Sequence, residues 1–161
     1  MKKQKTWIVI ISIIIVANIV FIWGNSLKSR SESQLLSLGV LQFIRPFLDA
    51  IFSPENVTDH LVRKLAHFTE FGALGVEFVL LTILLKKVRL QSILNCLFAG
   101  LIVALTDETI QLFSARGSQV SDVWLDFSGV VTGVMIVWLI FALVTATKKS
   151  SQGSARLNPR P

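Results

Sequence analysis

Four long apolar stretches constrain this chain more than any other feature of its sequence. They run over residues 7–23, 65–85, 90–113 and 123–147, and wound as helices they approach or exceed the thickness of a bilayer core. A water-soluble domain of 161 residues does not carry 52% hydrophobic and only 16% charged residues. The sequence therefore predicts an all-α fold, a four-span transmembrane bundle formed by one domain over residues 1–147. The polar tail 148–161 is expected to be disordered.

Basic residues lie where the apolar stretches end, and their placement predicts orientation. Cytoplasmic flanks retain positive charge during membrane insertion. With both termini inside, the cytoplasmic pieces contain no Asp or Glu and hold ten of the 16 basic residues, namely Lys2, Lys3, Lys5, Lys86, Lys87, Arg89, Lys148, Lys149, Arg156 and Arg160. We therefore expect a multi-pass protein of the plasma membrane with both termini in the cytoplasm.

Several other classes of protein are disfavoured by the same composition. The net charge of +6 does not indicate nucleic-acid binding, because the basic residues form no stripe interleaved with aromatics. A single cysteine, Cys96, excludes an intrachain disulfide and a thiolate metal site. The basic N-terminus also resembles a signal peptide, but Ile22-Trp23-Gly24 lacks a small-residue cleavage motif, so a retained first helix is expected.

The first external loop, residues 25–60, carries apolar residues at helical spacing, among them Leu36, Val40 and Phe43. Ser31 with Gln34 would make a capping box before them, and a break or bend is expected near Arg45-Pro46, because proline lacks a backbone donor. The pattern predicts an amphipathic interfacial helix lying along the outer membrane surface. A helix packed on the bundle as a cover is an equal alternative.

Three of the spans carry ionisable side chains, each costing about 2.5 to 3.5 kcal/mol at the centre of a bilayer. At 100° per residue, the polar residues of each span fall on one helical face, within arcs of about 80°, 100° and 60°. These faces hold Arg63, His67, Glu70 and Glu77 on the second span, Asp107, Glu108 and Gln111 on the third, and Asp122, Asp126, Gly129 and Gly133 on the fourth.

Chain direction places these faces at one depth. The second span enters from outside, and Asp107 follows Arg89 by about 27 Å of helix, which brings it close to the outer surface. The fourth span starts from the same side, and only Glu77 lies deeper. Ordinary roles account for single members: an interhelical hydrogen bond for His67, a helix cap for Asp122. Because these ionisable residues occur together on converging faces of three spans, they predict a polar site just beneath the outer surface of the membrane.

In their order, these residues resemble the VanZ-like family of small bacterial membrane proteins. The resemblance covers roughly residues 60–140 and rests on His67-Phe68-x-Glu70-Phe71, Asp107-Glu108-x-x-Gln111-x-Phe113-x-x-Arg116, Asp122-x-x-x-Asp126 and Gly129-x-x-x-Gly133. The chain departs at Ala115-Arg116-Gly117, where many members have Gly before the Arg, and at Asp126, where Asn is frequent. The resemblance implies a multi-spanning helical protein of the cell envelope and a link to susceptibility to teicoplanin, without a mechanism.

Two function classes compete for this site. In the first, it binds a lipid or lipid-linked cell-wall precursor headgroup, or changes the access of a lipoglycopeptide to it. Guanidinium and ammonium groups would face phosphate, and acids and amides would hold those cations or contact hydroxyls. The substrate-binding candidates are Arg63, Lys64, Glu108, Gln111, Arg116 and Asp122.

The alternative is a membrane-embedded hydrolase or transferase acting on an outer-leaflet, lipid-linked substrate. Its catalytic candidates are His67, Glu70, Asp107 and Asp126, because neighbouring carboxylates and a histidine divide acid and base roles. The same four side chains would also suit a divalent metal, although no His-Glu-x-x-His motif is present and no other cofactor is predicted.

Two further hypotheses concern single features. Glu77, deeper on the face of Glu70, hints at proton movement, but one deep acid makes only a short relay. The Gly129/Gly133 pattern predicts close helix packing, either within the monomer or across a homodimer.

Overall fold

A computed structural model describes residues 2–51, 57–114 and 119–157 of the chain, with side chains as far as Lys148. These residues form helices joined by short connections, with no strand among them. The helices are α1 (Lys2–Ser26), α2 (Arg30–Leu48), α3 (Asp59–Leu84), α4 (Leu90–Phe113) and α5 (Val120–Leu157).

Among the described residues, four helices are long and apolar enough to cross a membrane: α1, α3, α4 and residues 120–148 of α5. The all-α, four-span prediction is therefore confirmed, and α4 coincides with the predicted 90–113. By contrast, α3 begins at Asp59 rather than 65, because the Thr58 hydroxyl caps it by accepting from the backbone N–H of Leu61.

The fifth helix also differs from expectation at its far end. Its backbone stays helical to Leu157, inside the segment for which the sequence predicts a disordered tail. Helix propagation adds one hydrogen bond per residue once a nucleus exists, and after Thr147 the first proline is Pro159.

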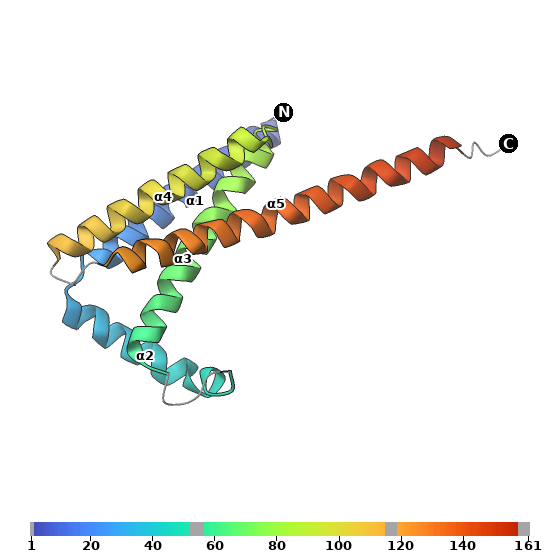
Figure 1. Ribbon diagram of the computed structural model, residues 1–161. Helices are drawn as coiled ribbons and strands as arrows, with labels where there is room; N and C mark the ends of the chain where they lie inside the picture. Colours follow the sequence, from blue (N-terminus) through green and yellow to red (C-terminus); the bar gives the residue numbers. More distant parts are fainter. Residues whose placement is uncertain (1, 52–56, 115–118, 158–161) are drawn as a thin grey trace.

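α3 is the central element of the bundle. It crosses α5 in the most extensive helix contact, while α1 packs against both α3 and α4 (Figure 1). Fully buried apolar side chains of α3, among them Phe71, Leu74 and Val79, meet Ile22 of α1 and Val130 of α5 in the main core. The same crossing brings the polar faces of α3 and α5 together at the end of the bundle near α2.

Glycines make the α3–α5 crossing unusually close. A Cβ at Gly129 would collide with the carbonyl oxygen of Phe68, and one at Gly133 with the carbonyl oxygen of Gly72. The two backbones touch because neither glycine carries a side chain. The Gly-x-x-x-Gly face is thus occupied by α3 within the chain, where the sequence left closing the monomer and dimerisation both open.

α2 is an amphipathic helix, but its cap is not the one predicted. The capping box is formed by Ser29 and Glu32, two residues before the predicted pair at Ser31 and Gln34. The Glu32 carboxylate accepts hydrogen bonds from both the backbone N–H and the hydroxyl of Ser29. In return, the Ser29 hydroxyl accepts a hydrogen bond from the backbone N–H of Glu32. Glu has the acceptor that this reciprocal pair needs at the third helical position.

Pro46 does not break α2, which runs through it to Leu48. Proline supplies no N–H to the carbonyl four residues before it, but the backbone hydrogen bonds resume after it, with the N–H of Asp49 donating to the carbonyl oxygen of Arg45. Buried Leu41 and Leu48 pack with Val57 and Val62, and so join α2 to the start of α3. Other apolar residues of the helix stay exposed, with Phe43 exposed by 87%, so α2 both covers the bundle and presents an apolar face outward.

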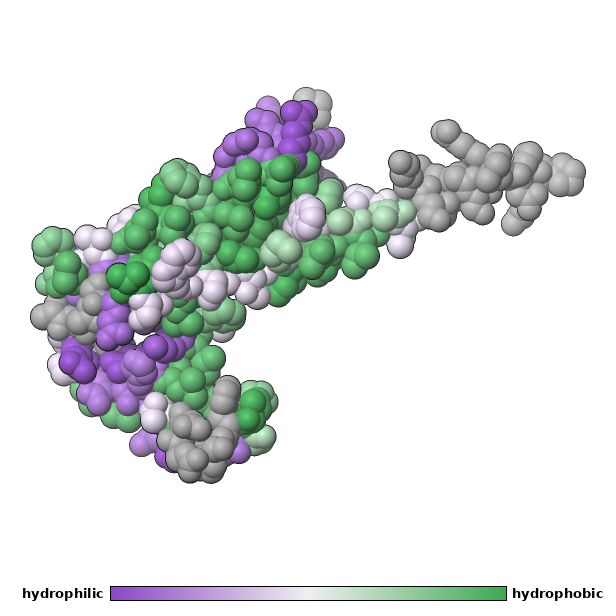
Figure 2. Space-filling model, viewed as in Figure 1, coloured by the Kyte–Doolittle hydropathy of each residue, from purple (hydrophilic) through white to green (hydrophobic). Residues whose placement is uncertain are grey.

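The surface divides into an apolar body and two hydrophilic regions (Figure 2). Exposed large hydrophobic residues cover α1, α4 and α5, as expected for helices that face lipid. One hydrophilic region surrounds the N-terminus, where Gln4 donates a hydrogen bond to the carbonyl oxygen of Leu84 at 2.6 Å. The other lies in the hollow between α2 and the bundle (Figure 2).

Candidate functional site

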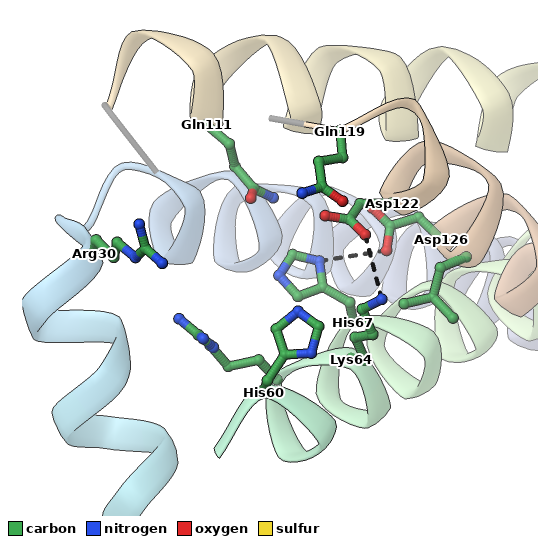
Figure 3. Close-up of a pocket in the computed structure, with 10 residues that line it drawn as sticks. Arg30, His60, Lys64, His67, Gln111, Gln119, Asp122 and Asp126 are labelled. Atoms are coloured by element: carbon green, nitrogen blue, oxygen red, sulfur yellow. Dashed lines mark ion pairs between the residues drawn. The ribbon is translucent and has the colours of Figure 1, made fainter. Parts of the chain in front are cut away.

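A polar cavity of about 130 Å³ lies in this hollow, at the end of the bundle that carries α2. Four helices and the residue just before α5 contribute to its wall, and their polar side chains point into a shared space (Figure 3). The lining residues are Arg30, His60, Arg63, Lys64, His67, Gln111, Gln119, Asp122, Leu125 and Asp126. We refer to this cavity as the polar pocket.

α3 supplies the basic side of the polar pocket. His60, Arg63, Lys64 and His67 stand at helical spacing along one face of this helix, so that all four line the same wall. Lys64 Nζ lies 3.9 Å from an Asp122 carboxylate oxygen on α5, which links the two helices across the pocket (Figure 3). Within α3 itself, an Arg63 guanidinium nitrogen lies 3.3 Å from an Asp59 carboxylate oxygen.

The floor of the pocket is formed by His67 and two buried carboxylates. His67 Nδ1 lies 3.4 Å from Asp126 Oδ1 and 3.8 Å from Asp107 Oδ2. Asp107 is fully buried and Asp126 is 1% exposed, whereas the His67 side chain is 17% exposed. Phe71, one turn along α3, stacks with the imidazole at a centroid distance of 6.4 Å and so helps to fix its plane.

Gln111 of α4 connects the floor of the pocket to α1. Its Nε2 donates to Asp107 Oδ2 at 2.7 Å, one turn away on α4, and to the Ser26 hydroxyl of α1 at 3.4 Å. All three side chains are buried. Four helices therefore meet around His67, Asp107 and Asp126, which positions these groups more rigidly than a loop would.

Glu108 is buried beside this cluster but does not line the polar pocket. Its Oε1 accepts a hydrogen bond from the backbone N–H of Gln119 at 2.5 Å, just before α5 begins. A buried carboxylate needs such donors to offset its lost hydration. This contact holds the start of α5 against α4 and gives Glu108 a structural role beside the predicted substrate-binding one.

A second cavity of about 220 Å³ opens between α2 and α3, next to the polar pocket. Arg63 and His67 line both cavities, so they form a shared wall. The second cavity is mainly apolar and is lined by Asn25, Lys28, Ser33, Leu36, Ser37, Val40, Val62, Arg63, Ala66, His67 and Glu70. We call it the α2–α3 groove.

The structure brings most of the predicted site residues together. Those that line the polar pocket are Arg63, Lys64, His67, Gln111, Asp122 and Asp126. Asp107 lies just beneath the pocket against His67, while Glu70 faces the α2–α3 groove instead. Arg116, predicted to bind substrate, lies outside the described residues.

Three polar residues of the pocket were missed by sequence reasoning. His60 has the same helical spacing as Arg63 and His67, so this signal was available in the sequence. Arg30 and Gln119 carried no such signal, because only the tertiary fold places the start of α2 and the approach to α5 beside α3.

Glu77 has an ordinary structural partner. Asn18 of α1 donates to the carboxylate, with its Nδ2 3.2 Å from each oxygen. The pair is an interhelical hydrogen bond between two spans. Proton movement through Glu77, one of the predicted alternatives, gains no further support from this arrangement.

The sequence was also compared with known proteins. Residues 6–142 match the VanZ/LLP1 family. The chain belongs to the VanZ/LLP1 family. This match covers all four spans up to residue 142 and every residue of the polar pocket, and it confirms the VanZ-like resemblance of the sequence. The chain has no match among curated proteins or among solved structures.

Proposed function

We propose that this VanZ/LLP1 protein binds the phosphate-bearing headgroup of a membrane amphiphile in the polar pocket, with the apolar chain of that molecule in the α2–α3 groove. The observation that carries the proposal is the wall shared by the two cavities, because Arg63 and His67 line both the polar pocket and the α2–α3 groove. A headgroup and its chain need such adjoining polar and apolar spaces.

Charge supports an anionic headgroup. Arg30 and Lys64 point into the pocket (Figure 3), and Arg63 also lines it. Guanidinium groups bind phosphate in bidentate fashion. Arg63 and Lys64 are held by Asp59 and Asp122 respectively. Arg30 has no carboxylate partner among the described residues, so its charge is available to a ligand.

The groove suits a hydrocarbon chain. Leu36 and Val40 of α2 face Val62 and Ala66 of α3 across it, and Lys28 and Glu70 lie at its polar margins. A cavity of about 220 Å³ accommodates part of an acyl or prenyl chain and leaves the rest in the bilayer. α2 would then be the element that separates the bound chain from water.

The position of the site in the membrane follows from the charges at the opposite end. Lys2, Lys3, Lys5, Lys86 and Lys87 flank the spans at the end away from α2, which favours that end as cytoplasmic. The polar pocket would then open toward the outer leaflet of the plasma membrane. Lipid-linked cell-wall precursors carry a phosphate or pyrophosphate on a prenyl chain at this place, and they are the ligand class we propose.

Binding is tested directly with dodecyl phosphate as the probe and the full chain in detergent micelles. Arg30→Gln is expected to weaken dodecyl phosphate binding by about tenfold or more, because a charge-assisted hydrogen bond is lost. The matched control is Arg45→Gln on the same helix, since Arg45 pairs with Asp49 at 3.7 Å and is 53% exposed. Absence of binding by the wild type, or equal weakening in both variants, contradicts the proposal.

The consequence for the cell envelope is tested by drug susceptibility. Expression of the wild type in a bacterial host is expected to reduce susceptibility to teicoplanin. Arg30→Gln and Glu70→Gln should reduce it less, because Arg30 lines the polar pocket and Glu70 lines the α2–α3 groove. Arg45→Gln serves as the control. Unchanged susceptibility on expression of the wild type counts against a role in glycopeptide response and leaves the binding test to stand alone.

A second candidate function is catalysis on the same lipid-linked ligand. It is favoured by His67, which lies between two buried carboxylates and lines the pocket. Such a histidine serves as general acid or base when a carboxylate orients its ring. Release of phosphate from an undecaprenyl-type diphosphate, lost in His67→Gln and retained in Arg45→Gln, would establish it. Stable binding without any turnover would exclude it for that substrate.

A further inference from the structure

We propose that His67, Asp107 and Asp126 bind a divalent transition-metal ion of the zinc class at the floor of the polar pocket. One ligand atom from each residue lies within 4.8 Å of the other two. The residues come from α3, α4 and α5, so the site exists only when the three helices are packed. The proposal stands on this cluster alone and does not require the headgroup function.

The spacing of the ligand atoms suits a small ion. A tetrahedral zinc site with bonds of about 2.0 to 2.2 Å separates neighbouring ligand atoms by about 3.3 to 3.6 Å. His67 Nδ1 stands 3.4 Å from Asp126 Oδ1 and 3.8 Å from Asp107 Oδ2. The three ligand atoms all lie within 4.8 Å of one another, so the two carboxylate groups would move closer together to bond one central ion.

The burial of Asp126 calls for a cation. This residue is 1% exposed, and neither carboxylate oxygen accepts a hydrogen bond of normal geometry from any described residue. A carboxylate inside a helical bundle that faces one imidazole at 3.4 Å regains only part of the hydration it has lost. Because Asp107 is also fully buried, the cluster places two acids around one histidine, and a divalent cation would balance their charge.

The surroundings of the cluster resemble the supporting shell of a metal site. Gln111 donates to the Asp107 oxygen nearest His67 at 2.7 Å, and Phe71 stacks with the imidazole. Outer contacts of this kind orient metal ligands and are part of what sets affinity. They also leave Nδ1 of His67 aimed at the carboxylates, on the side where the ion would lie.

The donor set selects the class of metal. One imidazole nitrogen with two carboxylate oxygens suits zinc and its first-row neighbours, whereas calcium and magnesium prefer oxygen ligands alone. Three protein ligands leave a fourth position open, as in catalytic zinc sites. Because His67, Gln111 and Asp126 line the polar pocket, that position would face the pocket and accept water or a ligand oxygen.

The test measures metal on the full chain, purified in detergent with any affinity tag removed. After equilibration with micromolar Zn²⁺ and desalting, the wild type is expected to retain about one zinc ion per chain. Loading with Co²⁺ is expected to give the visible absorption of a tetrahedral site with nitrogen and oxygen ligands. His67→Gln and Asp126→Asn should each lower zinc affinity at least about tenfold, since each removes one ligand.

Matched controls show whether zinc binding depends on the three ligands or only on negative charge near the pocket. Asp122→Asn removes an acid one turn away on the same helix, in the same pocket, and is expected to leave zinc affinity unchanged. Gln111→Leu keeps all three ligands and should weaken zinc binding by about 10- to 100-fold through the supporting contact. Circular dichroism shows whether each variant keeps its helical content, and Asp107→Asn replaces any variant that does not.

Two results overturn the proposal. One is a folded wild type that retains no zinc and shows no Co²⁺ absorption, in which case His67 simply links two carboxylates by hydrogen bonds. The other is zinc retained equally by the wild type, His67→Gln and Asp126→Asn, which places the ion elsewhere. Dodecyl phosphate binding, measured with and without chelator, distinguishes this failure from failure of the proposed function.

Discussion

His67 on α3 and Asp126 on α5 face each other across the most extensive helix contact of the described chain, with Nδ1 3.4 Å from Oδ1. The glycine contact accounts for this distance. Gly129, one turn after Asp126, lies directly against the backbone carbonyl of Phe68, the neighbour of His67. A motif that serves helix packing thus assembles the polar floor, and changes at the glycines should disturb packing and site together.

Gly133→Ala is expected to destabilise the protein. The added methyl group would collide with the carbonyl oxygen of Gly72, and overpacking of this kind costs about 1 to 3 kcal/mol. Gly39→Ala on α2 is the control, because a Cβ there meets nothing within 4 Å and alanine favours a helix by about 1 kcal/mol. Unfolding in detergent measures both. Equal or greater stability of Gly133→Ala would contradict the crossing described here.

Asn18→Leu is expected to lower stability by roughly 0.6 to 2 kcal/mol, because Glu77 loses the amide that donates to both its oxygens. Glu77→Leu in the same background should recover most of that loss, since no partly buried carboxylate is then left without its donor. The double-mutant cycle in detergent unfolding gives the coupling. Strictly additive effects would show that the pair contributes no interaction.

The stability of α2 is expected to depend on pH through Glu32. Hydrogen bonds from the hydroxyl and backbone of Ser29 hold the pKa of this exposed carboxyl below its usual range. A carboxyl whose pKa is lower in the folded than in the unfolded state stabilises the fold above the unfolded pKa, and this contribution is lost as pH falls through the folded value.

This dependence is measured by hydrogen exchange of the α2 amides in the wild type and in Glu32→Gln. The wild type is expected to show greater protection near neutral pH, and the difference should begin to shrink as pH falls through about 4.3, the ordinary pKa of glutamate, and vanish only below the lowered pKa of the folded state. Glutamine keeps an acceptor but has no charge to titrate, so its own protection should change less. A difference that grows as pH falls would reverse the predicted sign.

Membrane orientation is testable because Cys96 is the only cysteine and is buried. In a Cys96→Ser background, Ser31→Cys at the start of α2 is expected to react with an impermeant maleimide on intact cells. Lys87→Cys, between α3 and α4, should react only after lysis, because positive residues favour the cytoplasmic side. Both positions are exposed. The reverse pattern would place the polar pocket on the inside.

The limits of sequence reasoning are visible in α2. Its periodic apolar residues predicted the helix correctly, yet a break or bend was expected near Arg45-Pro46, and the capping box was placed at Ser31 and Gln34. The error in the cap is local, because several serines compete for one capping position. The expected break is absent, since the helix continues past Pro46 to Leu48. How α2 packs on α3 was not predictable, because an exposed apolar face suits either lipid or a neighbouring helix.

Sequence by itself determined the four spans and the helical face of each ionisable residue, because hydrophobic length and a 3.6-residue period act within one helix at a time. It also predicted most of the pocket, since acids and bases are too costly in lipid to be scattered at random. Only the tertiary structure decided that α3 covers the glycines of α5, that Arg30 joins the pocket and that Glu70 faces the groove. Those outcomes depend on how helices rotate and cross, and that geometry is set by contacts between segments far apart in the chain.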